Sequence, residues 1–280
     1  MNFGGFTEEF TDLEKSKVVI VPVPYDETST WIKGADKGPD AILDASANME
    51  LYDIESDCEI FEKGIHTANA VSEKSSPDKM VDAVYKEVSK YLNKDKFTVL
   101  IGGEHSVSIG SIKAFAEKYS DLTILQLDAH GDLRQEYEET IYNHACVMAR
   151  ARELCPIIQV GIRSMSIEER EFADKDRVFF AHQIYNNTNW MDKALSKLTK
   201  NVYITIDLDV FDPSIMPSTG TPEPGGLLWY DVLNFLKKVN QKANIVGFDV
   251  VELCPNIHSK GSDFLASKLI YQILNYKFSK

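Results

Sequence analysis

Apolar runs rich in β-branched residues alternate with amphipathic segments along the whole chain, and this alternation restricts the folds that the chain can adopt. Several of the apolar runs have no polar face, as expected of strands whose two sides are both covered. The segments between them place apolar residues three or four positions apart, which is the spacing of one helix face. Alternation of this kind predicts a parallel sheet with helices on both sides.

The expected elements follow from these patterns. We expect strands over 17–23, 97–101, 122–127, 157–162, 178–180, 202–208 and 244–251. We expect helices over 77–93, 112–119, 145–154, 167–173, 191–198, 230–239 and 262–276, with a surface loop over 71–79. The sequence shows no internal repeat and no long linker, so it predicts one α/β domain over residues 1–280.

The net charge of the chain and the length of its apolar runs limit the kinds of partner that it can bind. The chain has 43 acidic and 30 basic residues, a formal net charge of −13, so it lacks the basic surface that nucleic-acid binding requires. No apolar run approaches the ~20 residues that cross a bilayer. The first residues lack the basic and apolar pattern of a signal peptide. We therefore expect no nucleic-acid partner, no membrane partner and a cytoplasmic location.

Four of the expected strands finish in polar side chains. They are Glu104 and His105, then Asp128, His130 and Asp132, then Asp207 and Asp209, and finally Asp249 and Glu252. A single aspartate at a strand end commonly caps the next helix, and we prefer that interpretation for Asp212. Residues two apart in an extended chain point the same way, however, and parallel strands end at one edge of the sheet. The sequence therefore predicts that most of these polar groups meet.

Six of them form a set with a shared chemistry: His105, Asp128, His130, Asp132, Asp207 and Asp209. Four buried carboxylates cannot all stay ionised without countercharge, and two divalent cations would supply it. Oxygen and nitrogen ligands without a thiolate favour Mn(II), or Co, Fe or Mg, over structural zinc. Because water shared by two such ions ionises near neutral pH, the set predicts a binuclear hydrolase centre with a hydroxide nucleophile.

The motifs resemble those of the ureohydrolase family, which includes arginases and agmatinases. "GGEHS" at 102–106, "DAHGD" at 128–132 and "DLDVFDPSIMPSTGTPEPGG" at 207–226 resemble three family signatures, and 21–42 is similar to the amino-terminal segment of agmatinases. The resemblance covers nearly the whole chain. It implies an arginase-like three-layer α/β/α fold with a mainly parallel central sheet, two Mn(II) ions per subunit and a homo-oligomer, either trimer or hexamer.

The resemblance also implies how the two ions are shared among the ligands. One ion would be bound by His105, Asp128, Asp132 and Asp209, and the other by Asp128, His130, Asp207 and Asp209. Asp128 and Asp209 would then bridge the two ions.

Three further residues receive roles from the resemblance. His144 would carry protons to the leaving amine, a task suited to an ordinary histidine pKa of about 6.5. Glu252 would pair with the substrate guanidinium, for which a carboxylate is the natural bidentate partner. Thr221 would line the pocket beside it. Without the resemblance, His144 would be read as a residue in the first turn of a helix, and Glu252 as a surface acid after a strand.

The implied reaction is hydrolysis of a C–N bond in a small cationic guanidino compound, giving urea and an amine. The loop "LRQEYEETIYNHA" lacks the small polar residues that hold the carboxylate of arginine in arginases, and Ser166 lies near the place of the acid that holds its amino group. We therefore expect agmatine as substrate and putrescine as product. Glu136, Glu138 or Glu139 are weaker candidates for the distal cation of agmatine. Asn143, where many relatives have serine, leaves guanidinobutyrate open, and arginine is less favoured.

Two functions from other classes remain open. A binuclear phosphoesterase would use similar metal chemistry, but it needs cations to clamp phosphate, for which Arg134 and Arg163 are the candidates. A non-catalytic metal-binding scaffold would need neither His144 nor Glu252.

Overall fold

One eight-stranded sheet organises the described part of the chain, which in this computed structural model is residues 1–187 and 189–279. The strands are β1 (Val18–Val23), β2 (Ile65–Thr67), β3 (Phe97–Gly102), β4 (Leu122–Leu127), β5 (Ile157–Ile162), β6 (Val178–Phe180), β7 (Asn201–Asp207) and β8 (Asn244–Val251). Their order in the sheet is β2-β1-β3-β8-β7-β4-β5-β6, and each neighbouring pair is parallel. The predicted parallel sheet is confirmed.

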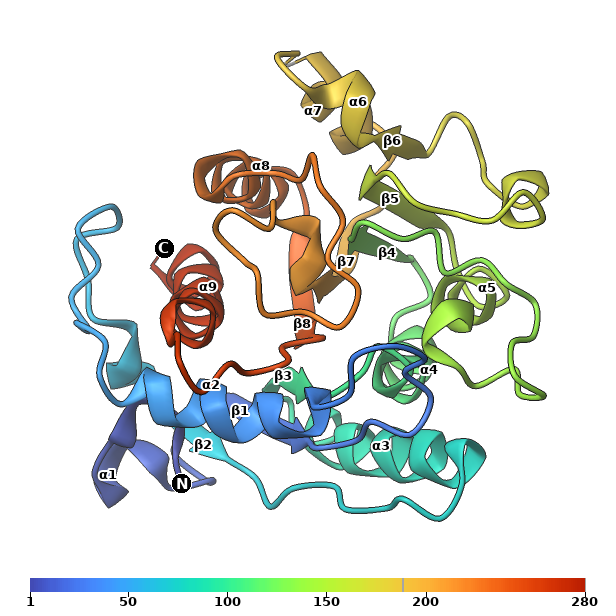
Figure 1. The fold of residues 1–280 in the computed structure, drawn as a ribbon. Coiled ribbons are helices and arrows are strands. Elements are labelled where there is room, and N and C mark those ends of the chain that lie inside the picture. The colour runs from blue at the N-terminus through green and yellow to red at the C-terminus, as the bar shows by residue number, and fades with distance from the viewer. Residues whose placement is uncertain (188, 280) are drawn as a thin grey trace.

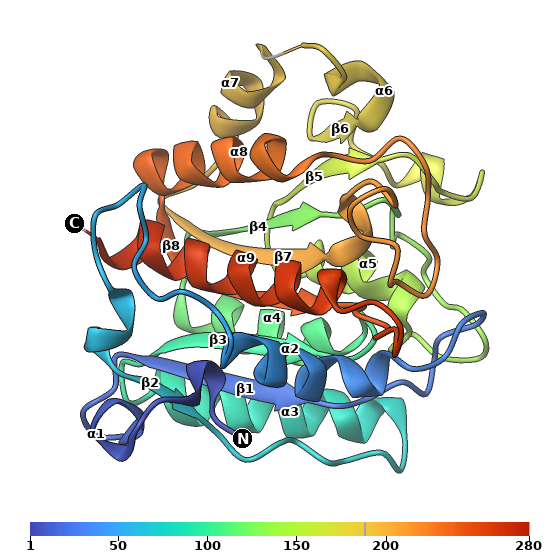
Figure 2. The same ribbon diagram turned by 60° about the vertical axis from the view of Figure 1, so that its left-hand side comes forward.

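Helices cover both faces of this sheet (Figure 1, Figure 2). They are α1 (Glu8–Thr11), α2 (Gly38–Ser46), α3 (Pro77–Leu92), α4 (Val107–Lys118), α5 (Val147–Ala151), α6 (Ala181–Ile184), α7 (Asn189–Leu195), α8 (Trp229–Lys242) and α9 (Gly261–Phe278). Helices α3, α4 and α5 lie on one face, and α2, α7, α8 and α9 lie on the other. Along β1, Val19 and Val21 pack in the core beneath α3, α4 and α5, while Val18 and Ile20 pack in the core beneath α2, α7, α8 and α9. Successive strand residues point to opposite faces of the sheet. The expected three layers are therefore present.

Four elements were not predicted: helices α1, α2 and α6 and the edge strand β2. The Gly38-Pro39 pair is typical of a turn, but in the structure it begins α2, where proline fits the first helical turn. Helix α2 buries Ile42 and Leu43, and the Ser267 hydroxyl of α9 donates to the Ile42 carbonyl oxygen at 2.8 Å. Packing between segments far apart in the sequence therefore decides this helix.

The expected helix over 167–173 is wrong, because only the short 3₁₀ turn Glu169–Glu171 forms there. The Glu169 carboxylate accepts hydrogen bonds from the backbone N–H groups of Leu133, at 2.9 Å, and Ser166, at 2.6 Å. These bonds tie the turn to the loop after β4. The expected helix over 145–154 is shortened to α5, and the expected helix over 112–119 begins earlier, at Val107.

Strands β3, β8, β7 and β4 are consecutive neighbours in the sheet, although they are distant in sequence. Their carboxyl ends therefore form one continuous edge, and in open α/β sheets ligands bind beyond that edge. Gly103 follows β3 at a very close approach to the β1 end, where an added Cβ would lie 1.9 Å from the Tyr25 carbonyl oxygen. Within the described residues, no helix is both long and apolar enough to cross a bilayer.

Candidate metal centre

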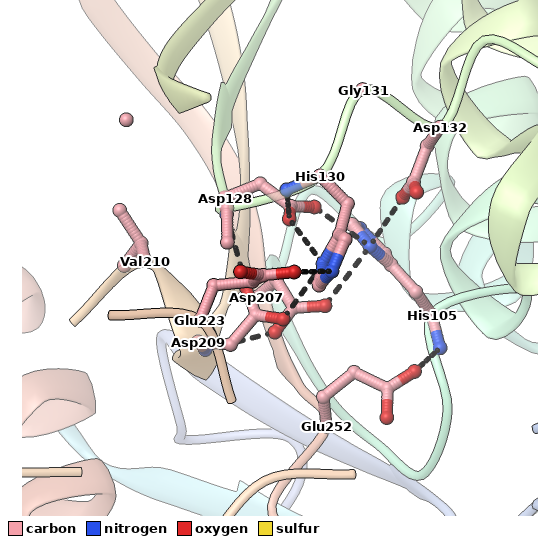
Figure 3. Close-up of polar contacts among 12 residues, drawn as sticks. His105, Asp128, His130, Gly131, Asp132, Asp207, Asp209, Val210, Glu223 and Glu252 are labelled. Carbon is pink, nitrogen blue, oxygen red and sulfur yellow. Dashed lines mark hydrogen bonds and ion pairs between the residues drawn. The ribbon is translucent and has the colours of Figure 1, made fainter. Parts of the chain in front are cut away.

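The four central strands carry the predicted polar side chains to one place (Figure 3). His105 follows β3, Asp128 to Asp132 follow β4, Asp207 ends β7, and Glu252 follows β8. All six candidate ligands of the sequence analysis converge there, and all but His130 are buried. Their convergence is the geometric condition on which the predicted centre depends.

Short distances connect the two imidazoles to the carboxylates. His105 Nδ1 lies 3.0 Å from Asp132 Oδ2, 3.2 Å from Asp128 Oδ2 and 3.4 Å from Asp207 Oδ2. His130 Nδ1 lies 2.9 Å from Asp209 Oδ2 and 3.6 Å from Asp128 Oδ1. These atoms include two sets close enough to hold an ion each, His105 with Asp128 and Asp132, and Asp128 with His130 and Asp209. Asp128 belongs to both sets.

The contacts distinguish the two carboxylates at the end of β7. Asp209 was expected to bridge, but its close contact is with His130. Asp207 instead faces His105, while the charges of Asp209 and Asp128 act on it from the other set. Asp207 therefore lies on the His105 side of the cluster and Asp209 on the His130 side, which supports the sharing of Asp128 and Asp207 proposed below.

Backbone amides fix one oxygen of each of three carboxylates. Asp128 Oδ1 accepts from His130 N–H at 2.6 Å, Asp207 Oδ1 from Asp209 N–H at 2.9 Å, and Asp209 Oδ1 from Ala129 N–H at 3.0 Å. The second oxygen of Asp207 and of Asp209 faces a histidine of the cluster. The loops therefore hold the carboxylates in orientations that suit a shared cation.

His105 provides a test of whether a metal fits. Its Nε2 lies 2.8 Å from Thr205 Oγ1, whose single hydroxyl proton is donated to Asp249 Oδ1 at 2.7 Å. Thr205 must then accept from His105 Nε2–H, which in the neutral imidazole leaves the lone pair on Nδ1. Nδ1 is buried and has no hydrogen-bond partner among the described residues, although three carboxylates surround it. A cation coordinated by Nδ1 and these carboxylates satisfies both, so the residues fit a divalent metal.

The pKa values show how strongly the cluster lacks positive charge. Burial lowers the pKa of the His105 imidazole, but Asp128, Asp132 and Asp207 outweigh burial and raise that pKa well above its ordinary value. Burial and the Asp128 charge raise the pKa of Asp132 to about 7. Burial and the charges of Asp209 and Asp128 raise the pKa of Asp207. Protons are retained where the chain offers no other countercharge.

Supporting residues within the strands were missed by sequence reasoning. Gln126 Nε2 donates to Asp128 Oδ2 at 2.7 Å, and Thr205 connects His105 to Asp249. Gln126 and Thr205 each stand two positions before a ligand in a largely apolar strand, so each points to the same face as that ligand. A polar residue at this spacing is the signal that identifies them. Glu223 Oε1, 3.9 Å from His130 Nε2, carries no such signal.

A cavity of about 340 Å³ opens on the candidate ligands His105, His130, Asp132 and Asp207. His144, Thr221 and Glu252 also line it, as the sequence analysis expected. Glu252 Oε1 accepts a hydrogen bond from the backbone N–H of His105 at 2.7 Å. Glu252 itself has a positive φ of 66°, a strained backbone conformation for a non-glycine residue. Burial and the nearby Glu104 charge raise the pKa of Glu252 well above its ordinary value. This carboxylate therefore also requires a cationic partner to stay ionised.

The environment of His144 differs from the expectation. Burial, followed by the charges of His105 and His130, lowers the His144 pKa to about 4. The imidazole is therefore neutral near pH 7, and the expected pKa of about 6.5 does not hold. A neutral ring can accept a proton before it donates one.

The acidic residues of the cavity wall differ from those expected to hold the distal cation. Among the described lining residues is Glu169, whereas Glu136, Glu138 and Glu139 are absent from the cavity wall. The sequence pattern gave no sign of Glu169, since it fell within the expected helix over 167–173.

Two residues have structural roles close to the cavity. Arg163 Nη2 donates to the backbone carbonyl oxygens of Asp209 at 2.6 Å and Glu223 at 2.8 Å. Asp212 was expected to cap a helix, but no helix follows it directly. Its carboxylate instead accepts from the N–H groups of Ser214, Gly225 and Gly226, each at 3.0 Å, and so closes the 212–226 loop.

Comparison with known proteins agrees with this geometry. Residues 16–275 match the sequence profile described as "Arginase family". An N(1)-aminopropylagmatine ureohydrolase of Synechocystis sp. is 38% identical, with 96% of this chain and 92% of that protein covered. An agmatinase of Pyrococcus horikoshii is 31% identical, with 94% and 93% covered.

Solved structures show the same fold. The crystal structure of the agmatine ureohydrolase of Thermoplasma volcanium aligns with a TM-score of 0.87 and 32% identity, covering 98% of this chain and 96% of that one. The match to the family profile, the parallel sheet and the clustered candidate ligands all point to the same family. This chain belongs to the arginase family and is a ureohydrolase, an enzyme that hydrolyses a C–N bond of a guanidino compound.

Proposed function

We propose that this enzyme hydrolyses agmatine, or agmatine carrying an N1-aminopropyl group, to urea and the corresponding amine. The observation that carries the proposal is the single cavity in which Glu252, His144 and the cluster of candidate ligands meet. Agmatine is the substrate favoured by the loop sequences. The aminopropyl derivative is the second candidate because the Synechocystis relative named for it is 38% identical to this chain.

The metal proposal rests on the donor set. His105, Asp132 and the shared Asp128 and Asp207 would hold one ion, and His130 and Asp209 would complete the site of the other with the shared pair. Manganese is the proposed metal, since the ligands are oxygen and nitrogen without a thiolate. Two divalent ions, when bound, would supply positive charge next to the guanidinium and lower the pKa of water.

Side chains of the cavity would orient the substrate and move the proton. The Glu252 carboxylate pairs with the guanidinium and thereby fixes its central carbon in the cavity. The guanidinium in turn supplies the positive charge that the raised Glu252 pKa calls for. Neutral His144 takes the proton released by the attacking water and donates it to the departing nitrogen, so that the amine leaves protonated. Thr221 lies on the cavity wall beside them.

Glu169 is the proposed partner of the distal amine. It lines the cavity, it is 4% exposed, and two backbone N–H groups hold its carboxylate in place. Ser166, which also lines the cavity, has no charge with which to hold an α-amino group. A fixed anion at the cavity wall favours a substrate whose far end is cationic over guanidinobutyrate, whose far end is anionic.

The structure weakens the phosphoesterase alternative. Of its two candidate clamps, Arg163 directs its guanidinium to backbone carbonyl oxygens. Arg134 stacks on the Tyr137 ring, with its guanidinium carbon 4.5 Å from the ring centroid. One stacked arginine beside several carboxylates is a poor phosphate site.

The test is a substrate panel with purified, Mn²⁺-loaded protein. Agmatine, N1-aminopropylagmatine, arginine and 4-guanidinobutyrate are compared by urea release, and an aryl phosphate is compared by phosphate release. We expect urea from one or both of the first two compounds, at a kcat/KM at least ~10-fold above the others, the effect of one charge contact. Phosphate release alone would establish the phosphoesterase, and absence of both products would favour the scaffold.

A further inference from the structure

His144 is held by a polar chain that does not include the metal ligands. Thr28, in the loop after β1, places its hydroxyl oxygen 3.1 Å from the His144 backbone nitrogen and 3.3 Å from the ring atom Nδ1. The same hydroxyl donates to Glu104 Oε1 at 2.9 Å. Both Thr28 and Glu104 are buried, at 6% and 0% exposure. Three segments distant in sequence therefore meet behind the imidazole.

Counting protons decides the direction of each hydrogen bond. Ser106 N–H donates to Glu104 Oε2 at 2.8 Å, and Ser106 Oγ donates to Oε1 at 2.8 Å. Both oxygens of Glu104 thus accept from donors of the chain. The single hydroxyl proton of Thr28 goes to this carboxylate, so the Thr28 oxygen can only accept from His144. The ring nitrogen next to it, Nδ1, must then carry the hydrogen.

This arrangement fixes a tautomer. With Nδ1 protonated, the neutral imidazole has its lone pair on Nε2, the nitrogen that remains for the cavity. A proton received from the attacking water would bind at Nε2 and leave from Nε2 to the departing amine, while Nδ1–H stays in place throughout. The opposite tautomer would present an N–H where an acceptor is needed.

The Thr28 hydroxyl is not needed to hold its loop. Gly103 N–H donates to the Val23 carbonyl oxygen at 2.9 Å, and Glu104 N–H donates to the Tyr25 carbonyl oxygen at 2.9 Å. Asp26 Oδ2 accepts from Gly34 N–H at 2.6 Å and closes the other side of the loop. Backbone and Asp26 contacts therefore already fix the segment, and the hydroxyl is directed to His144 and Glu104.

We propose that Thr28 and Glu104 are positioning residues that keep His144 in the Nδ1–H tautomer for proton transfer to the leaving amine. The inference rests on the proposed function for the proton acceptor, and on the hydrogen bonds above for the tautomer.

A kinetic cycle tests the coupling. Thr28→Val removes the hydroxyl at nearly constant volume, and Thr28→Ser restores it. We expect Thr28→Val to lower kcat at least ~10-fold, with KM and bound metal unchanged. This loss would be a part of the ~10²–10⁴-fold that a general acid or base contributes. Thr28→Ser should recover most of kcat. In the His144→Asn background, Thr28→Val should have no further effect, because residues acting as one unit are not additive. Equal losses in both backgrounds would overturn the proposal.

A spectroscopic measurement separates this inference from the proposed function. In ¹⁵N-histidine-labelled full-length protein with diamagnetic Mg²⁺, the resonances missing from His144→Asn identify His144. We expect the Nδ1–H pattern in the native protein and a shift toward Nε2–H in Thr28→Val. A native Nε2–H pattern would overturn the proposal whatever the substrate is. If the substrate panel fails while the Nδ1–H pattern is found and lost with the hydroxyl, the proposed function falls and the positioning of His144 stands.

Discussion

Two groups of buried carboxylates lie side by side at the carboxyl edge of the sheet. They differ in the partners that satisfy their oxygens. Asp249 and Glu104 are fully buried and receive their hydrogen bonds from the chain itself. Tyr203 and Thr205 hydroxyls donate to Asp249, each at 2.7 Å, and Thr28 and Ser106 donate to Glu104. These groups are complete without any ligand.

The ligand cluster is not complete in this way. Asp207 and Asp209 each have one oxygen held by a backbone N–H and the other turned toward a histidine shared with further carboxylates. Burial is similar in the two groups, so burial alone does not mark function. The difference is that the chain satisfies the supporting carboxylates, whereas the cluster requires an external cation.

Removal of divalent cations is the strongest test of that difference. We expect a chelator to abolish urea release and Mn²⁺ to restore it, with two ions bound per chain. The refilled protein should also be more stable, by about 2.7 kcal/mol for each ion when free Mn²⁺ is at 100 times the Kd of that site. Urea assays, metal analysis and thermal unfolding measure these effects. Full turnover after chelation would contradict the assignment.

Asp249→Asn tests whether the hydrogen-bonded Asp249 supports metal binding by the cluster of candidate ligands. The two hydroxyls donate to different oxygens of Asp249, and the amide NH2 group that replaces one oxygen cannot accept, so the hydroxyl network that orients His105 through Thr205 is weakened. We expect a ~10–100-fold loss of metal affinity, as for other groups that orient a ligand. Ser111→Ala is the matched control, because Ser111 bonds Tyr203 in the same network at 2.7 Å but does not touch Thr205 or His105 in any contact described above. Equal losses in both variants would indicate general destabilisation.

Glu169→Gln tests an acid that is held by the chain yet faces the cavity. Loss of the charge should raise KM for agmatine ~10-fold or more with a smaller change in kcat, the size expected for one charge-assisted hydrogen bond. Glu171→Gln changes an exposed neighbour in the same turn and serves as control. An unchanged KM in Glu169→Gln would remove Glu169 from substrate binding.

Asp212→Asn should have the smallest effect, since the Asp212 carboxylate closes the 212–226 loop and lies outside the cluster of candidate ligands. Hydrogen bonds from Ser214, Gly226 and Gly225 lower the Asp212 pKa to about 2. A folded-state pKa below the ordinary value of about 3.8 gives stability that is complete above pH ~4 and is lost as the pH falls toward 2. We expect the variant to lose ~1 kcal/mol at pH 7 in urea unfolding, and the difference from the native protein to shrink at pH 3. A constant difference would place the effect in packing.

Much of the fold could be predicted because it depends on local pattern. The ranges for β4, β5, β6 and β8 agree with the structure, since continuous apolar runs have few alternatives to a doubly covered strand. The helix expected over 167–173 failed because a distant loop binds Glu169. Helix α2 was missed because its stability comes from α9. Both errors concern segments whose conformation is decided by partners far away in sequence.

The sequence by itself determined the kinds of groups present at the site and their side of the sheet. Spacings of two residues set which side chains share a face, and parallel strands bring their ends to one edge. Only the tertiary structure decided that β3, β8, β7 and β4 are adjacent, that Asp207 rather than Asp209 approaches His105, and that His144 has a lowered pKa. Distances between segments and the burial of charge depend on packing in three dimensions, and neither is a property of local sequence.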